Sequence, residues 1–94
     1  MNKVSADKLP PQALEVEKTL LGSLLIDREA INKVADVLRP EDFYQRSHQV
    51  IYQAVLTLFD KRDPIDLLSL ANKLEEMGHL EDIGGMAYLT SLAG

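Results

Sequence analysis

Two histidines are the first residues in this 94-residue sequence whose type could support chemistry. His48 and His79 lie 31 positions apart. They lack the i, i+4 spacing and the companion carboxylate that a zinc site on a helix uses. We therefore predict that His48 forms a hydrogen bond within the first turn of its own helix, and that His79 belongs to an exposed helix cap.

Adjacent carboxylates are the second group that could do chemistry, as a general acid and a general base. The pairs are Glu41/Asp42, Glu75/Glu76 and Glu81/Asp82. Neighbouring residues on a helix point in different directions, and no nucleophile lies near any pair in the sequence. We interpret these pairs as solvated surface, and a small enzyme that works through a carboxylate pair stays an alternative.

The glycine pair and the charge balance bear on nucleotide and nucleic-acid binding. Gly84 and Gly85 are followed by Met86 and Ala87, whereas a phosphate-binding loop ends in Gly-Lys-Ser/Thr. The chain has 10 basic and 15 acidic residues, a net charge of −5, and DNA affinity depends largely on Lys and Arg. We therefore expect no catalytic residue, no cofactor, no metal and no direct DNA binding.

Without cysteines, a signal segment or a membrane span, the expected location is the cytoplasm.

Helices must position these groups, because apolar residues recur at intervals of three and four along the chain. We predict a compact all-α bundle of about five short helices over residues 10–94, preceded by a flexible polar leader at residues 1–9. The first helix begins near Pro11, the second follows a cap at Asp27 and ends before Pro40, the third covers residues 47–61, the fourth follows a cap at Asp66 and ends before Gly78, and the fifth follows Gly84 and Gly85.

The faces of these helices can also be predicted. The first helix has an apolar stripe that leaves Glu15 on the solvent side, and Gly22 within it indicates a close crossing by another element. That stripe consists of Ala13, Val16, Leu20 and Leu24. A single turn at residues 41–43 is expected to direct Phe43 and Tyr44 inward. Tyr88, on the last helix, suits either the core or an interface.

Four groups of residues are specific when their order and spacing are taken together. They are Pro10-Pro11-Gln12 with Glu15, Glu17, Leu21-Gly22 and Asp27; Leu-Arg-Pro-Glu-Asp-Phe-Tyr at 38–44 with His48 and Ile51-Tyr52; Pro-Ile-Asp-Leu at 64–67; and Leu-Glu-Asp-Ile-Gly-Gly-Met-Ala-Tyr-Leu at 80–89. Over residues 10–92 the chain resembles the N-terminal domain of the bacterial replicative DNA helicase, the DnaB family. Ser47 stands where that family often has proline, and we expect it to cap the third helix.

The resemblance implies a helical head that, in the whole helicase, precedes a helical hairpin, a linker and a RecA-like motor with its ATP and Mg²⁺ site. We expect this fragment to stop before those parts and not to be an enzyme. The resemblance also implies self-association into a trimer-of-dimers collar of the hexamer, docking of the C-terminal domain of primase, and a helicase loader as a further partner. Within that interface we expect Glu15 and Tyr88 to contact primase. The alternative is the helicase-binding domain of primase, which has a similar fold but different motifs.

Overall fold

The computed structural model describes residues 13–94, and every regular element in that range is helical. The elements are α1 (Leu14–Ile26), α2 (Ala30–Val34), the 3₁₀ turn η1 (Pro40–Asp42), α3 (Arg46–Asp60), α4 (Leu67–Glu76) and α5 (Gly85–Ala93). This confirms the predicted all-α fold of five short helices. The predicted leader and the helix start at Pro11 lie outside the described residues. No helix in residues 13–94 combines the length and the apolar character needed to cross a membrane.

The helix ends follow the capping residues in α4 but not in α3. The Asp66 carboxylate accepts a hydrogen bond of 2.8 Å from the Ser69 N–H, which confirms the predicted N-cap of α4. The expectation that Ser47 caps α3 is wrong. The helix begins one residue earlier, at Arg46, and Gln45 occupies the N-cap position without a side-chain hydrogen bond.

The second helix is shorter than the sequence pattern predicts. The Asp27 carboxylate accepts a hydrogen bond of 2.9 Å from the Glu29 N–H, so it caps the turn that precedes α2. The helix ends at Val34, and the chain then continues through turns in which the Leu38 N–H donates to the Val34 carbonyl at 2.8 Å. Apolar spacing alone therefore overestimates this helix, because turns continue the same spacing.

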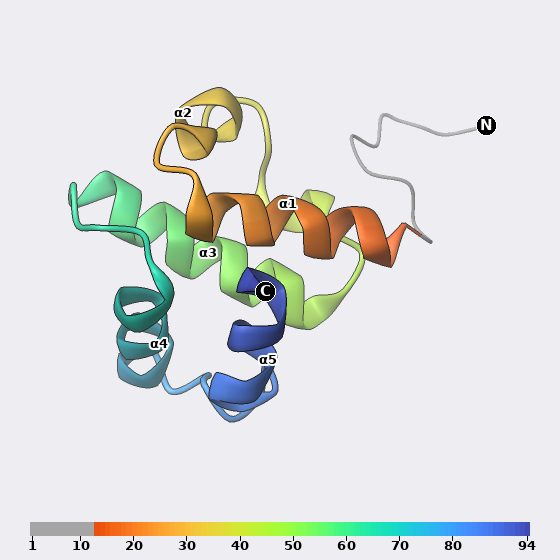
Figure 1. Ribbon diagram of the computed structural model, residues 1–94, viewed down its shortest axis with the longest axis vertical. Helices are drawn as coiled ribbons and strands as arrows, with labels where there is room; N and C mark the ends of the chain where they lie inside the picture. The colour runs from red at the N-terminus through yellow and green to blue at the C-terminus, as the bar shows by residue number, and fades with distance from the viewer. Residues whose placement is uncertain (1–12) are drawn as a thin grey trace.

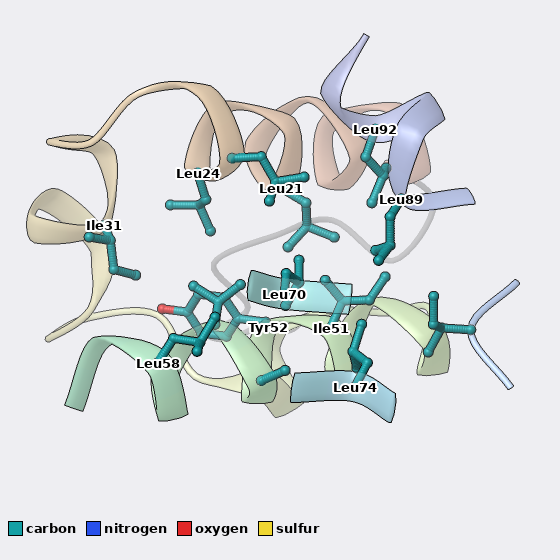
Figure 2. Packing of buried hydrophobic residues seen from close by; sticks show 14 of the residues in the cluster. Leu21, Leu24, Ile31, Ile51, Tyr52, Leu58, Leu70, Leu74, Leu89 and Leu92 are labelled. Atoms are coloured by element: carbon teal, nitrogen blue, oxygen red, sulfur yellow. The ribbon is translucent and has the colours of Figure 1, made fainter. Parts of the chain in front are cut away.

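The hydrophobic core lies between α1, α3, α4 and α5, with α2 at one end of α1 (Figure 1). Leu21 and Leu24 of α1 point toward Ile51 and Tyr52 of α3, as Figure 2 shows. The Tyr52 side chain is fully buried, and its hydroxyl donates to the Leu38 carbonyl at 2.9 Å. Tyr52 thereby fixes the turns after α2 to the centre of the bundle.

The buried face of α1 is rotated relative to the predicted stripe. Val16 is 51% exposed, whereas Glu17 is completely buried. In the segment after η1, Phe43 is buried as predicted but Tyr44 is 61% exposed, so the expectation for Tyr44 is wrong. Both differences involve the same contact. The Tyr44 backbone N–H donates to the buried Glu17 carboxylate, and the Tyr44 side chain faces solvent.

Gly22 marks the closest approach between α1 and α5, which confirms the crossing predicted from the sequence. A Cβ atom on Gly22 would lie only 2.3 Å from the backbone carbonyl oxygen of Leu92. Any side chain at this position would therefore force the two helices apart. The absence of a Cβ lets α5 pack directly on α1, with its Leu89 and Leu92 side chains in the core.

Candidate functional site

A chain of hydrogen bonds through three side chains joins α1, α3 and α5. The Nδ1 atom of His48 lies 2.6 Å from Oε1 of Glu17, and its Nε2 atom lies 2.5 Å from the hydroxyl of Tyr88. Both Glu17 and His48 are buried. The expectation that His48 bonds within its own first turn is therefore wrong, since its two ring nitrogens reach residues on two other helices.

The Glu17 carboxylate occupies the N-terminal end of α3. The backbone N–H groups of Tyr44 and Gln45, which directly precede the helix, donate to its two oxygens at 2.5 and 3.3 Å. A helix N-terminus carries partial positive charge and unpaired N–H groups, so it stabilises an anion. With His48 as a third donor, this environment explains how the carboxylate can be buried without a Lys or Arg partner among residues 13–94.

The direction of these hydrogen bonds follows from the chemistry of the groups. An ionised carboxylate only accepts, so Nδ1 of His48 carries a proton. In the neutral imidazole, Nε2 is then the acceptor and the Tyr88 hydroxyl is the donor. Burial raises the pKa of the Tyr88 hydroxyl, although Lys18 opposes that shift. Tyr88 therefore stays neutral at physiological pH and is not an activated nucleophile.

Tyr88 also forms part of a surface pocket of about 410 Å³. The pocket is lined by residues of α1, the start of α3 and the turn before α5, among them Lys18, Ser47, His48, Asp82 and Tyr88. Tyr88 is half-buried; its hydroxyl belongs to the buried chain, and the residue also lines this pocket. It combines the core and surface positions that the sequence left as alternatives.

Glu15, the other residue singled out from the sequence, lies on the solvent side of α1 as expected. Its side chain is 88% exposed and makes one contact of 3.4 Å with Lys18 Nζ. An exposed pair of this kind contributes little to stability. Lys18 lines the same pocket as Tyr88, so it connects the two predicted partner-binding residues. The structure thus places Glu15 beside the pocket rather than in the buried chain.

The remaining polar candidates do not form a second cluster in the described part of the chain. His79 is half-buried and its Nδ1 lies 3.1 Å from Asp82, one turn further on. Of the predicted carboxylate pairs, five residues are exposed as predicted: Glu41, Glu75, Glu76, Glu81 and Asp82. Asp42 is half-buried instead, and its carboxylate accepts a hydrogen bond of 2.8 Å from the Arg39 N–H. Within residues 13–94 no group of three His, Cys, Asp or Glu side chains could hold a metal ion.

Sequence reasoning missed the role of Glu17, although a signal for it was present. Glu17 is separated by four, seven and eight positions from Leu21, Leu24 and Leu25, so helical periodicity places it on their face. A polar residue in phase with a buried stripe indicates a buried hydrogen-bonding partner elsewhere. Its partner His48 is 31 positions away, and no local pattern connects the two residues.

Comparison with known proteins identifies the family that has this fold. Residues 9–94 match the model of the DnaB-like helicase N-terminal domain. This chain belongs to that family. The sequence is 41% identical over 93 residues to the replicative DNA helicase DnaC of Bacillus subtilis, and 38% identical over 93 residues to the replicative DNA helicase DnaB of Geobacillus stearothermophilus. In each case the match covers 99% of this chain and 20% of the relative, so the chain spans about a fifth of their length.

A solved structure agrees with this assignment to the DnaB-like N-terminal domain family. The crystal structure of the N-terminal domain of DnaB helicase from Mycobacterium tuberculosis superposes with a TM-score of 0.85 at 41% sequence identity, covering 90% of this chain and 62% of that one. The family match favours a DnaB-like domain over the primase domain raised as the alternative from the sequence. The resemblance carried by the four groups of residues is thereby confirmed.

Proposed function

We propose that this DnaB-like domain is the N-terminal assembly and protein-interaction domain of a hexameric replicative DNA helicase. In this role it contributes to the collar of the ring through a trimer of dimers, and it docks the C-terminal domain of primase during DNA replication in the cytoplasm. A helicase loader is a further candidate partner. The observation that carries the proposal is the family match over residues 9–94.

The proposal assigns no catalytic step to this chain. ATP, Mg²⁺ and strand separation belong to a motor domain elsewhere in a longer parent protein, as the length of the curated relatives suggests. The Glu17–His48–Tyr88 chain supports a binding role over catalysis. Its carboxylate is enclosed by three donors, and its terminal hydroxyl is kept neutral by burial.

The proposed primase contact is the surface formed by Glu15, Lys18 and Tyr88, which we call the Tyr88 face. Glu15 offers an exposed carboxylate and Lys18 an ammonium group, while Tyr88 offers a half-buried phenol that lines the pocket. Tyrosine is enriched in interfaces because it combines apolar area with a polar tip. A half-buried tyrosine is also held in place before binding, and this lowers the entropy lost on association.

Isothermal titration of this chain with the C-terminal domain of its cognate primase tests the docking proposal. We expect saturable binding that weakens as salt increases and that is reduced by Glu15→Ala. Thr90→Ala is the matched control, because Thr90 is an exposed residue of α5 outside the pocket. Absence of binding by both this chain and a longer chain that includes the following segment would contradict primase docking.

Assembly into a collar requires a separate measurement. Sedimentation velocity on the full-length parent and on a version lacking residues 1–94 compares the hexamer population directly. We expect the shortened protein to lose hexamers at low concentration, because a contribution to subunit contacts is removed. Unchanged assembly would show that this domain is not part of what holds the ring together.

A further inference from the structure

The turn between α4 and α5 ends in two glycines with left-handed backbones. Gly84 has a φ of 108° and Gly85 a φ of 71°. The Gly84 N–H donates to the Glu81 carbonyl at 3.1 Å, and the Gly85 N–H donates to the Leu80 carbonyl at 2.9 Å. Gly84 is also the N-cap of α5. Because side chains disfavour a positive φ, the backbone accounts for a glycine at both positions alike.

The two glycines differ in what a side chain would touch. A Cβ atom on Gly84 would lie 2.8 Å from Cβ and 3.3 Å from Cγ of Tyr88. Both distances are shorter than the ordinary contact of about 3.5–4.0 Å between carbon atoms. Within residues 13–94, a Cβ atom on Gly85 would meet no other side chain within 4 Å beyond its chain neighbours. Only Gly84 therefore leaves space that Tyr88 occupies.

The space beside Gly84 bears on the orientation of the whole Tyr88 side chain. Gly84 contacts the root of this side chain, while its hydroxyl, at the tip, lies 2.5 Å from Nε2 of His48. The planes of the Tyr88 and His48 rings differ by only 15°, with their centroids 5.9 Å apart. Because the ring is rigid, a displacement at the root is enlarged at the tip. The contact with His48 therefore reports whether the root is correctly placed.

Gly84 belongs to the same surface as Tyr88. Gly84 is exposed, and both residues line the pocket of about 410 Å³ that also includes Lys18. Gly85 does not line this pocket. A side chain at position 84 would thus crowd Tyr88 at the surface proposed for docking, whereas one at position 85 would not.

We propose that Gly84 is a positioning residue of the Tyr88 face. Its missing Cβ lets the Tyr88 side chain leave α5 in the orientation that meets His48 and lines the pocket. A ring that its neighbours hold before binding loses little conformational entropy on association. This inference rests on the proposed docking of primase at the Tyr88 face, and it adds the residue that sets the geometry of that contact.

The two glycines form a matched pair of variants that separates positioning from backbone strain. Gly84→Ala and Gly85→Ala both place a side chain on a left-handed backbone, so both should lower the melting temperature. Isothermal titration with the C-terminal domain of the cognate primase is run where both variants are folded. We expect Gly84→Ala to weaken binding about fivefold, as for one misplaced interface side chain, and Gly85→Ala to change it by less than about twofold. Equal weakening by both variants overturns the proposal.

A double-mutant cycle shows whether Gly84 acts through Tyr88. Tyr88→Ala removes the ring and should itself weaken primase binding. In that background Gly84→Ala should change the affinity by less than about twofold, because no ring remains to be positioned. A further weakening as large as in the parent chain overturns the proposal, since Gly84 would then affect binding by another route.

Nuclear magnetic resonance tests the positioning without relying on primase binding. In the free chain, nuclear Overhauser contacts of Tyr88 with the Gly84 Hα atoms and with the His48 ring should be present. Gly84→Ala should lose the contact between the two rings, and Gly85→Ala should keep it. Retention of that contact in Gly84→Ala overturns the proposal even if primase binds no form of the chain, an outcome that would contradict the docking function separately.

The same contacts can be followed in the unchanged chain when primase is added, so this arm does not depend on the folding of a variant. We expect the contacts of Tyr88 with Gly84 and His48 to persist in the complex. Their loss on binding overturns the proposal, because Tyr88 would then meet primase in an orientation that Gly84 does not set.

Discussion

The Glu17 carboxylate and the His48 imidazole are in contact at 2.6 Å, although 31 positions of sequence separate them. Both are buried, and Glu17 gives Nδ1 of His48 a hydrogen-bonding partner in the core. Because Glu17 also accepts from the backbone before α3, this one contact fixes the start of α3 against α1. It is the polar counterpart of the apolar packing between the same helices.

The first prediction concerns the charge of Glu17. Glu17→Gln places an amide NH₂ among three donors, so we expect the free energy of unfolding to fall by about 2–4 kcal/mol. Urea denaturation followed by circular dichroism measures this loss. Glu15→Gln, two positions earlier and exposed, should change stability by less than about 0.5 kcal/mol. Equal effects of the two variants would show that burial of Glu17 does not matter for folding.

The second prediction separates the two roles of Tyr88. Tyr88→Phe keeps an aromatic ring at this position but removes the hydroxyl partner of buried His48. We expect the free energy of unfolding to fall by about 1–2 kcal/mol. Primase binding should be retained, because the aromatic ring is still present. Thermal unfolding and the titration described above are run on the same preparation. A stability equal to that of the parent chain would mean that water or another group replaces the hydroxyl.

The third prediction tests the crossing of α1 and α5. Ala is usually about 1 kcal/mol better than Gly inside a helix, but a Cβ on Gly22 would lie 2.3 Å from the Leu92 carbonyl oxygen. We therefore expect Gly22→Ala to destabilise the domain by about 1–3 kcal/mol. Ser23→Ala, the adjacent position in α1, is the matched control and should be close to neutral. Stabilisation by Gly22→Ala, measured by urea denaturation, would contradict the close packing.

The fourth prediction is a loss of stability at alkaline pH. Burial, with a contribution from Asp42, raises the pKa of Tyr52 from 10.0 to about 12. Between these values the unfolded chain has lost a proton that the folded chain retains, so stability falls as pH rises. The slope is about 1.4 kcal/mol per pH unit, and the loss levels off near pH 12. Burial also raises the pKa of Tyr88, so this residue contributes to the loss in the same direction.

Tyr52→Phe isolates the share of Tyr52 in that alkaline loss. The variant has no phenol at this position and should show a shallower decrease in the free energy of unfolding above pH 10. At neutral pH it should lose about 1 kcal/mol, because the Leu38 carbonyl loses its donor. An unchanged alkaline slope would assign the effect to other groups.

The positions of the helices could be predicted from the sequence because the relevant signals are local. Asp66, Gly78 and the glycine pair at 84–85 mark ends that depend only on nearby backbone groups. The end of α2 was missed, because the turns after Val34 continue the apolar spacing of a helix. Tyr44 and Val16 were placed in the core on hydrophobicity, but a backbone hydrogen bond and the true phase of α1 expose them.

The site was less predictable than the fold for a physical reason. Glu15 could be assigned to solvent from helical phase alone. The partners of His48, by contrast, come from two helices that lie 31 and 40 positions away, so their contact exists only after the bundle has formed. The left-handed backbone of Arg62, with a φ of 61°, was equally unpredictable, since it follows from the hydrogen bonds that end α3.

The crossing of Gly22 and Leu92 has a consequence for the order in which the domain can form during translation. The two residues are 70 positions apart, and long-range contacts of this kind form late, because a long segment of chain must be ordered first. As α1 leaves the ribosome, its apolar face has no α5 to cover it. The core is completed only when α5 emerges, because Leu89 and Leu92 of that helix belong to it.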